Sequence, residues 1–96
     1  MRMIASYRNK ETEQFSLGMR VREFESVERA ARLKLNKLRD APTLADIAHL
    51  PGNRFERLKG SREGQCSIRI NDRWRICFTW DDQSQGFANV EIVDYH

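Results

Sequence analysis

The spacing of the apolar residues changes once along the chain, and this change restricts the possible folds more than any other feature. Between residues 27 and 39 the apolar positions follow a helical repeat and form one stripe, made of Val27, Ala31, Leu35 and Leu38. After residue 53 apolar and polar residues alternate instead, which is typical of half-buried strands. Helices followed by a run of strands predict an α+β fold, in which helices cover one face of an antiparallel sheet and leave the other partly open.

Shorter elements are expected before the long helix. Residues 4–7 predict a first strand, and residues 10–17 predict a short helix with Phe15 and Leu17 on its buried side. Gly18 can end this helix, because glycine readily adopts the left-handed conformation that is common at helix C-termini.

Start and stop signals also surround the long helix. Ser26 is a residue type preferred at N-caps, so we expect the helix to begin directly after it. Pro42 stops it, and Thr43 with Asp46 predicts a capping box for one further turn. The strands that follow are expected over residues 54–58, 65–70, 74–80 and 88–95, with a two-residue hairpin turn at Asn71-Asp72.

Length and cysteine content limit the class of protein. Ninety-six residues leave room for one hydrophobic core, so residues 1–96 are expected to form a single domain. No apolar run approaches the roughly 20 residues of a membrane span, and the first residues lack a signal-peptide pattern. A cytoplasmic location without membrane contact is therefore expected. Cys66 and Cys77 are too few for a four-ligand zinc site; a disulfide between them is conceivable, but alternation points them to opposite faces and favours reduced thiols.

Basic residues are concentrated in one segment. The net charge is +3, and residues 54–75 hold seven Lys/Arg against three Asp/Glu, whereas residues 76–96 hold four acidic residues and no Lys or Arg. An arginine-rich segment indicates a polyanionic partner, most simply nucleic acid. The alternative is a solvated surface with scattered arginines.

Alternation along the predicted strands indicates which side chains share a face. The inward positions are Cys66, Ile68, Ile70, Trp74, Ile76, Phe78, Trp80, Val90, Ile92 and Asp94. The open face is expected to gather Arg69, Arg73, Arg75 and Tyr95, with Lys59 and Arg62 on an adjoining loop. Guanidinium groups suit phosphate oxygens and an aromatic ring can stack on a base, so this face predicts an RNA-binding surface.

Possible proton-transfer groups are expected beside this basic face, namely Glu56, Asp94, Tyr95 and His96. RNA carries its own nucleophile, the 2′-hydroxyl, so cleavage requires no metal ion or cofactor. It requires a base for that proton, an acid for the leaving 5′-oxygen and cations to stabilise the charge at phosphorus. Each residue also has a structural interpretation: Asp94 in a salt bridge, Tyr95 at the sheet edge, His96 as an idle terminal residue and Glu56 as an offset to neighbouring arginines.

Five stretches together resemble a known family. They are LPGNR at 50–54, LKGSREGQ at 58–65, SIRIN at 67–71, WRI at 74–76 and VDYH at 93–96. In this combination the chain resembles the HigB-type toxins, also called plasmid maintenance killer proteins, and within them the GraT-like members of the RelE superfamily. The similarity begins at Met3 and extends over nearly the whole chain.

This resemblance implies a RelE-like fold and ribosome-dependent cleavage of messenger RNA. The partner that it implies is a HigA-type antitoxin with a helix-turn-helix domain, and the two proteins together would bind their own operator DNA. By motif, Arg75 matches the arginine that stabilises the transition state. The other matches are Asp94, Tyr95 and His96, implicated in activity, and Lys59 and Arg62, basic positions for RNA or the ribosome.

One position departs from part of the family, because Glu56 stands where some members have a histidine implicated in catalysis. Either Glu56 or His96 is therefore the candidate base. Two rival functions stay open. A non-catalytic nucleic-acid-binding module would use the same arginines without needing Tyr95 or His96, and a degenerate toxin would retain antitoxin binding only.

Overall fold

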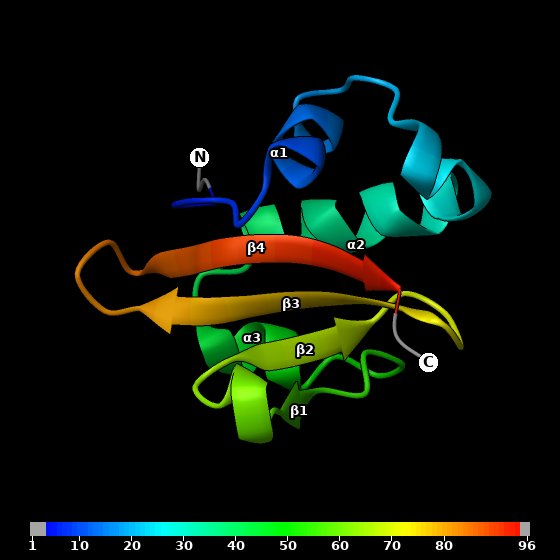
Figure 1. Ribbon diagram of the computed structural model, residues 1–96. Helices are drawn as coiled ribbons and strands as arrows, with labels where there is room; N and C mark the ends of the chain where they lie inside the picture. The colour runs from blue at the N-terminus through cyan, green and yellow to red at the C-terminus, as the bar shows by residue number, and fades with distance from the viewer. Residues whose placement is uncertain (1–3, 95–96) are drawn as a thin grey trace.

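A four-stranded antiparallel sheet with helices on one side makes up the computed structural model, which describes residues 4–94 (Figure 1). The strands lie in chain order and are β1 Glu56–Arg57, β2 Cys66–Arg69, β3 Trp74–Asp81 and β4 Gly86–Asp94. The α-helices are α1 Lys10–Ser16, α2 Glu28–Asp40 and α3 Leu44–Ala48, and the 3₁₀ helices are η1 Arg22–Val27 and η2 Gly60–Arg62. The α+β class predicted from the sequence is confirmed.

The long helix α2 packs on the sheet through its apolar stripe, with α3 beside it on the same face (Figure 1). All members of the predicted stripe are buried: Val27, Ala31, Leu35 and Leu38. The predicted N-cap is wrong, because η1 runs directly into α2 and Val27, not Ser26, occupies the cap position. The amide of Glu28 bonds to the carbonyl of Glu25 in η1, so the backbone of the preceding 3₁₀ turn satisfies this group without a side-chain cap.

Helix α1 is fixed between β4 and α2. Phe15 is fully buried, as predicted, and the buried hydroxyl of Thr12 accepts a hydrogen bond from a backbone amide of β4 at 3.1 Å. Two arginines of α2 bind the last carbonyls of α1: Arg32 donates to the Phe15 oxygen at 2.8 Å and Arg39 to the Ser16 oxygen at 3.0 Å. They satisfy acceptors that a helix C-terminus leaves without an intrahelical partner.

The ends of the shorter helices follow their sequence signals in part. Gly18 has φ +99°, as expected of a glycine just beyond a helix, but Leu17 is exposed rather than buried because α1 ends at Ser16. Thr43 and Asp46 form the predicted capping box of α3. Within the described residues, no helix has both the length and the apolar character that crossing a lipid bilayer requires.

The first predicted strand is reduced to one bridge at the outer edge of the sheet. Residues 4–7 run parallel to β4, with the Ala5 amide bonded to the Phe87 oxygen at 2.8 Å. Only Tyr7 forms a ladder pair, a parallel bridge with Val90. The segment therefore extends the sheet without forming a regular strand.

A β-bulge in β4 changes the phase of the last strand. Thr79 pairs with Ala88 and Cys77 with Glu91, so two residues of β4 lie opposite one residue of β3. Asn89 is the extra residue and has φ +53°, a left-handed conformation that asparagine tolerates better than most residues.

The bulge has a clear consequence for the core. Phe87 and Val90 are three positions apart, so regular alternation would point them to opposite faces. With the bulge both are buried. Phe87 then makes edge contacts with Phe78 at 5.2 Å and with Trp80 at 5.1 Å between ring centroids. The inward position predicted for Trp80 is confirmed.

The hairpin turn between β2 and β3 is longer than predicted. The amide of Ile70 bonds to the carbonyl of Trp74 at 2.8 Å, which leaves three residues in the turn instead of two. The side-chain oxygen of Asn71 accepts hydrogen bonds from the amides of Arg73 and Trp74 at 2.9 and 2.8 Å. Arg73 therefore belongs to the turn and not to the alternating strand.

Candidate active site

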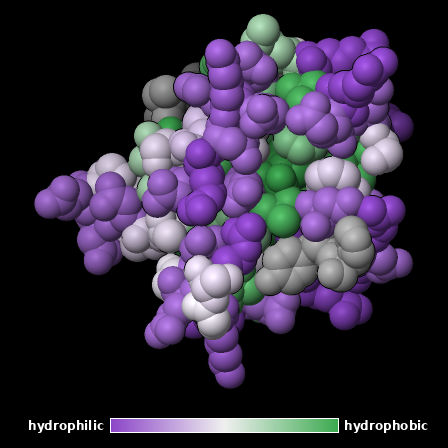
Figure 2. All heavy atoms as spheres, in the orientation of Figure 1, coloured by the Kyte–Doolittle hydropathy of each residue, from purple (hydrophilic) through white to green (hydrophobic). Residues whose placement is uncertain are grey.

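The sheet face turned away from α2 and α3 carries the residues that the sequence predicts for function. In the register of β2 and β3, Ser67 lies opposite Cys77 and Arg69 opposite Arg75, while Glu56 of β1 lies opposite Ser67. The view onto this face in Figure 2 is dominated by hydrophilic residues, with hydrophobic ones confined to a narrow region. The predicted division into an apolar helix-covered face and a polar open face is therefore confirmed.

Arg75 is held in a fixed position on this face by three residues, one from β2 and two from the segment that enters β1. Its Nε donates to the hydroxyl of Ser67 at 2.8 Å, and its Nη2 donates to the backbone oxygen of Arg54 at 2.6 Å. The same Nη2 lies 3.2 Å from the carboxylate of Glu56. The Arg75 side chain is only 13% exposed, whereas Glu56 is 60% exposed. The guanidinium is thus partly embedded, and its carboxylate neighbour stands on the solvent side.

Two of these contacts were not foreseen from the sequence. Ser67 is fully buried, and Arg54 has φ +46°, which turns its carbonyl toward Arg75. The signal for Ser67 was present, since it alternates with Ile68 on β2 and so shares a face with Arg69 and Arg75. A backbone carbonyl gives no comparable signal, because its direction depends on the local backbone angles.

The other predicted RNA-binding residues are placed unequally. Arg69 lies next to Arg75 in the sheet, but its Nη2 bonds to the carboxylate of Asp72 in the hairpin turn. Lys59 is exposed and precedes η2. Its ammonium group makes no salt bridge with any of residues 4–94, so it is the cation of this set with the most freedom to meet a phosphate.

Arg62 is part of an ion-pair network rather than an open cation. Its Nη1 donates to Gln65 at 3.0 Å and to the carboxylate of Glu91 at 3.2 Å. Arg8 approaches the same carboxylate at 3.6 Å. These groups lie over Cys77, and burial raises the pKa of the Cys77 thiol. Both cysteines are buried, and neither forms a disulfide within the described residues.

Arg73 does not join the arginines of the open face. Its Nε and Nη2 bind the two carboxylate oxygens of Asp94 at 3.2 and 2.6 Å. Asp94 pairs with Trp74 in the register, on the inward phase. The expectation that Arg73 faces outward with Arg75 is thus wrong, and Asp94 adopts its structural alternative, a salt bridge. Tyr95 and His96 lie outside the described residues.

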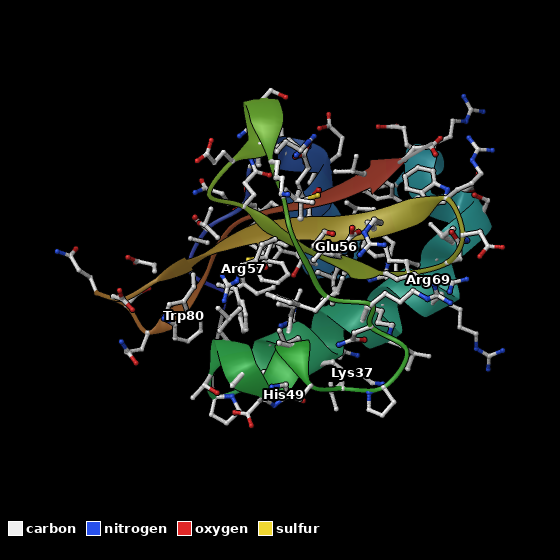
Figure 3. The ribbon with its side chains drawn as sticks, turned by 90° about the horizontal axis from the view of Figure 1, so that it is seen from below. Lys37, His49, Glu56, Arg57, Arg69 and Trp80 are labelled. Carbon is white, nitrogen blue, oxygen red and sulfur yellow. The ribbon has the colours of Figure 1, made fainter. Side chains whose placement is uncertain are left out.

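Other polar and aromatic side chains lie away from this site. His49 and Lys37 are exposed and lie on the side of the helices, apart from Glu56 (Figure 3). Trp74 makes an edge contact with Phe24 at 5.9 Å and packs on the core, as predicted. Among residues 4–94, no cluster of three or more His, Cys, Asp or Glu side chains has the arrangement of a metal site.

The site therefore offers an oriented guanidinium, an adjacent exposed carboxylate and further cations nearby. A guanidinium that is fixed before the substrate arrives can stabilise negative charge on a phosphate without reorganisation. A carboxylate beside it can accept a proton from a hydroxyl that lies within hydrogen-bonding distance. These are two of the functions that metal-free RNA cleavage requires.

Comparison with known proteins identifies the family of this chain. The family model for the RelE-like toxin of the type II toxin-antitoxin system HigB matches residues 5–96. Toxin HigB-1 of Vibrio cholerae serotype O1 is 42% identical over 71 residues, which make up 74% of this chain and 72% of that protein.

Solved structures share the architecture at lower identity. The YoeB–YefM toxin-antitoxin complex from Staphylococcus aureus matches with a TM-score of 0.62 at 23% identity, covering 100% of this chain and 99% of that chain. The YoeB/ParE toxin from Agrobacterium tumefaciens matches with a TM-score of 0.60 at 15% identity, covering 100% of both chains. At these identities the likeness demonstrates the fold alone.

Proposed function

The chain belongs to the RelE-like HigB toxins of type II toxin-antitoxin systems, and from this premise we propose that it cuts messenger RNA on the ribosome and thereby inhibits translation. The observation that carries the proposal is the fixation of Arg75, whose guanidinium is bound by Ser67, Arg54 and Glu56 on the open face of the sheet. A buried structural arginine would not need to be aimed at this face.

The proposed chemistry uses the RNA as its own nucleophile. A base on the toxin removes the proton of the 2′-hydroxyl, whose oxygen then bonds to the adjacent phosphorus. The bond from phosphorus to the 5′-oxygen breaks, and an acid protonates that oxygen as it leaves. The products are a 2′,3′-cyclic phosphate and a free 5′-hydroxyl, and the balance requires no metal ion or cofactor.

The roles follow from this scheme. Arg75 stabilises the charge that builds on the phosphate in the transition state. Glu56 or His96 acts as the base, and only the family resemblance assigns Asp94 and Tyr95 a part in activity. The structure supports Glu56 as the candidate, because its carboxylate lies 3.2 Å from Arg75 and is exposed to solvent. Lys59 and Arg69 hold RNA phosphates or the ribosome.

A toxin of this class binds an antitoxin, and the proposed antitoxin here is a HigA-type protein with a helix-turn-helix domain. The toxin would contact operator DNA only within that complex. The proposed place of action is the cytoplasm, where ribosomes and messenger RNA are found.

The experiment mixes purified toxin with ribosomes programmed with an end-labelled message, and with the same message alone. We expect cleavage products only in the presence of ribosomes, and none when the antitoxin is added first. If toxin that saturates ribosome binding leaves the message intact, the chain is a binding module or a degenerate toxin and the proposal fails.

A further inference from the structure

The LPGNR segment at residues 50–54 contains a buried polar residue whose role the proposed function leaves unexplained. Asn53 is fully buried, although asparagine usually lies at the surface. Its amide nitrogen Nδ2 donates to the carbonyl of Ile47 in α3 at 2.9 Å. Its Oδ1 accepts a hydrogen bond from the ammonium group of Lys34 in α2. The orientation of the amide is unambiguous, because lysine can only donate and a carbonyl can only accept.

The backbone of Asn53 is equally engaged. Its amide bonds to the Leu50 oxygen at 3.3 Å, and its carbonyl accepts from the amide of Arg69 in β2 at 2.6 Å. Asn53 thus joins α2, α3 and β2 through three of its groups, and its backbone amide bonds within the turn that follows α3. Aspartate would lack the donor toward Ile47, and serine would be too short to reach both partners, so asparagine is the residue that satisfies the position.

The next residue connects this junction with the active site. Arg54 follows Asn53 directly and has φ +46°, and its carbonyl accepts from Nη2 of Arg75 at 2.6 Å. A non-glycine residue in this left-handed region is held there by its surroundings. Asn53 is the anchored residue on one side of Arg54. The direction of the Arg54 carbonyl therefore depends on how firmly Asn53 is fixed.

We propose that Asn53, held by Lys34, is a positioning residue that orients the Arg75 guanidinium through the carbonyl of Arg54. The inference rests on the proposed function for the part that concerns cleavage. It assigns a task to Lys34, a lysine of the helical layer. Partial burial, with help from the neighbouring charges of Lys37 and Arg69, lowers the pKa of Lys34, as expected of an ammonium group that is partly withdrawn from solvent.

The test uses two variants and one matched control in the full-length chain. Lys34→Met removes the ammonium group and keeps an apolar stem, and Asn53→Asp removes the donor toward Ile47. Lys37→Met is the control, because Lys37 lies on the same helix, is exposed and does not bond to Asn53. Lys34→Arg retains a charged donor and serves as the conservative rescue.

Cleavage on programmed ribosomes separates positioning from binding. We expect the maximal single-turnover rate to fall in Lys34→Met and Asn53→Asp, by up to about 10²-fold, as for a misplacement of about 1 Å in a catalytic group. The toxin concentration that gives half of this rate should stay unchanged. Lys37→Met should match wild type, and Lys34→Arg should recover most of the rate. A rise in the half-saturating concentration with an unchanged maximal rate would overturn the proposal.

A second readout does not depend on catalysis. The Nε–H of Arg75 bonds to the buried hydroxyl of Ser67 at 2.8 Å, so its ¹H–¹⁵N resonance should be resolved and slow to exchange. Its assignment follows from its loss in Arg75→Lys. We expect the resonance to shift or broaden in Lys34→Met but not in Lys37→Met. An unchanged resonance in Lys34→Met overturns the positioning role. This readout decides the proposal even if the Asn53→Asp variant does not fold. If wild type fails to cut RNA while the resonance responds as expected, the proposed function is wrong and the positioning of Arg75 still holds.

Discussion

Replacement of Arg75 by lysine tests whether the shape of the guanidinium, and not only its charge, produces cleavage. In the structure Nε donates a hydrogen bond to Ser67, while Nη2 donates to the Arg54 carbonyl and forms an ion pair with Glu56. Two nitrogens of one rigid plane therefore fix the guanidinium. A lysine keeps the positive charge but has a single nitrogen. It can occupy one of these two positions and must leave the other, so the charge is no longer aligned with the phosphate.

The expected magnitude follows from what is lost. Removing one oriented contact to the transition state typically costs about 10²–10³ in rate, which corresponds to about 2.7–4 kcal/mol of transition-state stabilisation. Stability should fall as well, because the fully buried hydroxyl of Ser67 loses its partner. An unsatisfied buried polar group costs about 1–3 kcal/mol in free energy of unfolding. Arg75→Lys should therefore be a folded protein with a severely reduced rate.

The assay is single-turnover cleavage of an end-labelled message on saturating programmed ribosomes, together with urea unfolding to verify that the variant is folded. Arg57→Lys is the matched control. Arg57 is an exposed arginine of the same region, and it contacts the Cys66 sulfur at 3.9 Å and lies 5.6 Å from the centroid of the Phe55 ring instead of joining the Arg75 cluster. If Arg75→Lys cuts at the wild-type rate while folded, the oriented guanidinium is not the source of catalysis.

Further expectations concern stability, proton transfer, RNA binding and metal dependence. Leu35→Ala should lower the free energy of unfolding, measured in urea, by roughly 2–5 kcal/mol. Leu33 lies on the same helix but is 59% exposed, so Leu33→Ala should change this free energy by less than about 0.5 kcal/mol. Equal effects of the two substitutions would contradict the packing of α2. Loss of the catalytic base typically costs about 10²–10⁴ in rate, so either Glu56→Gln or His96→Gln should show this loss in single-turnover cleavage, and wild-type rates in both would exclude the acid–base assignment. Lys59→Ala should reduce the slope of log affinity against log salt for ribosome binding by up to about 0.7–0.9, the value of one phosphate contact; an unchanged slope would remove Lys59 from the interface. Treatment of the toxin with EDTA, removed before ribosomes and magnesium are added, should leave cleavage unaffected, and a lasting loss would indicate a required metal ion.

Local periodicity made the helical layer and the two sheet faces predictable. The stripe of α2 and the inward side of β3 are set by burial at a fixed repeat, which requires no knowledge of distant residues. That alternation places Ile68 and Ile76 on the buried face and Arg69 and Arg75 on the open face, whereas their pairing in the register depends on the three-residue turn. The placement of Arg75 on the open face was for this reason correct.

Turn length was the main source of error in the site. The side chain of Asn71 caps two amides and allows a turn one residue longer than the two-residue type. That extra residue is Arg73, which leaves the alternating strand and reaches Asp94 instead of the open face. The bulge at Asn89 is a comparable case, since an extra residue resets the phase for everything that follows it. Both the longer turn and the bulge are local backbone conformations that the periodicity of apolar residues alone does not reveal.

The carboxylate partners of Arg62 and Arg75 lie far from them in the sequence and could not be predicted. The exposure of each carboxylate helps to decide which arginines can bind RNA. The carboxylate of Asp72 beside Arg69 is 92% exposed and that of Glu56 beside Arg75 is 60% exposed, whereas Glu91 beside Arg62 is only 17% exposed. Exposed ion pairs typically contribute about 0–1 kcal/mol, so an incoming phosphate can displace their carboxylates at little cost. A pair with a shielded acid resists such exchange, since breaking it leaves a partly buried charge without its partner. Arg69 is therefore the arginine that can exchange its carboxylate for a phosphate at little cost. Arg75 is itself only 13% exposed and keeps its position in the site, and Arg62 holds the η2 loop to β4. The basic residues of this segment thus have two different functions, which the composition alone could not separate. A few cations around Arg75 are available to bind phosphate, and the others form fixed ion pairs that stabilise the structure of the open face.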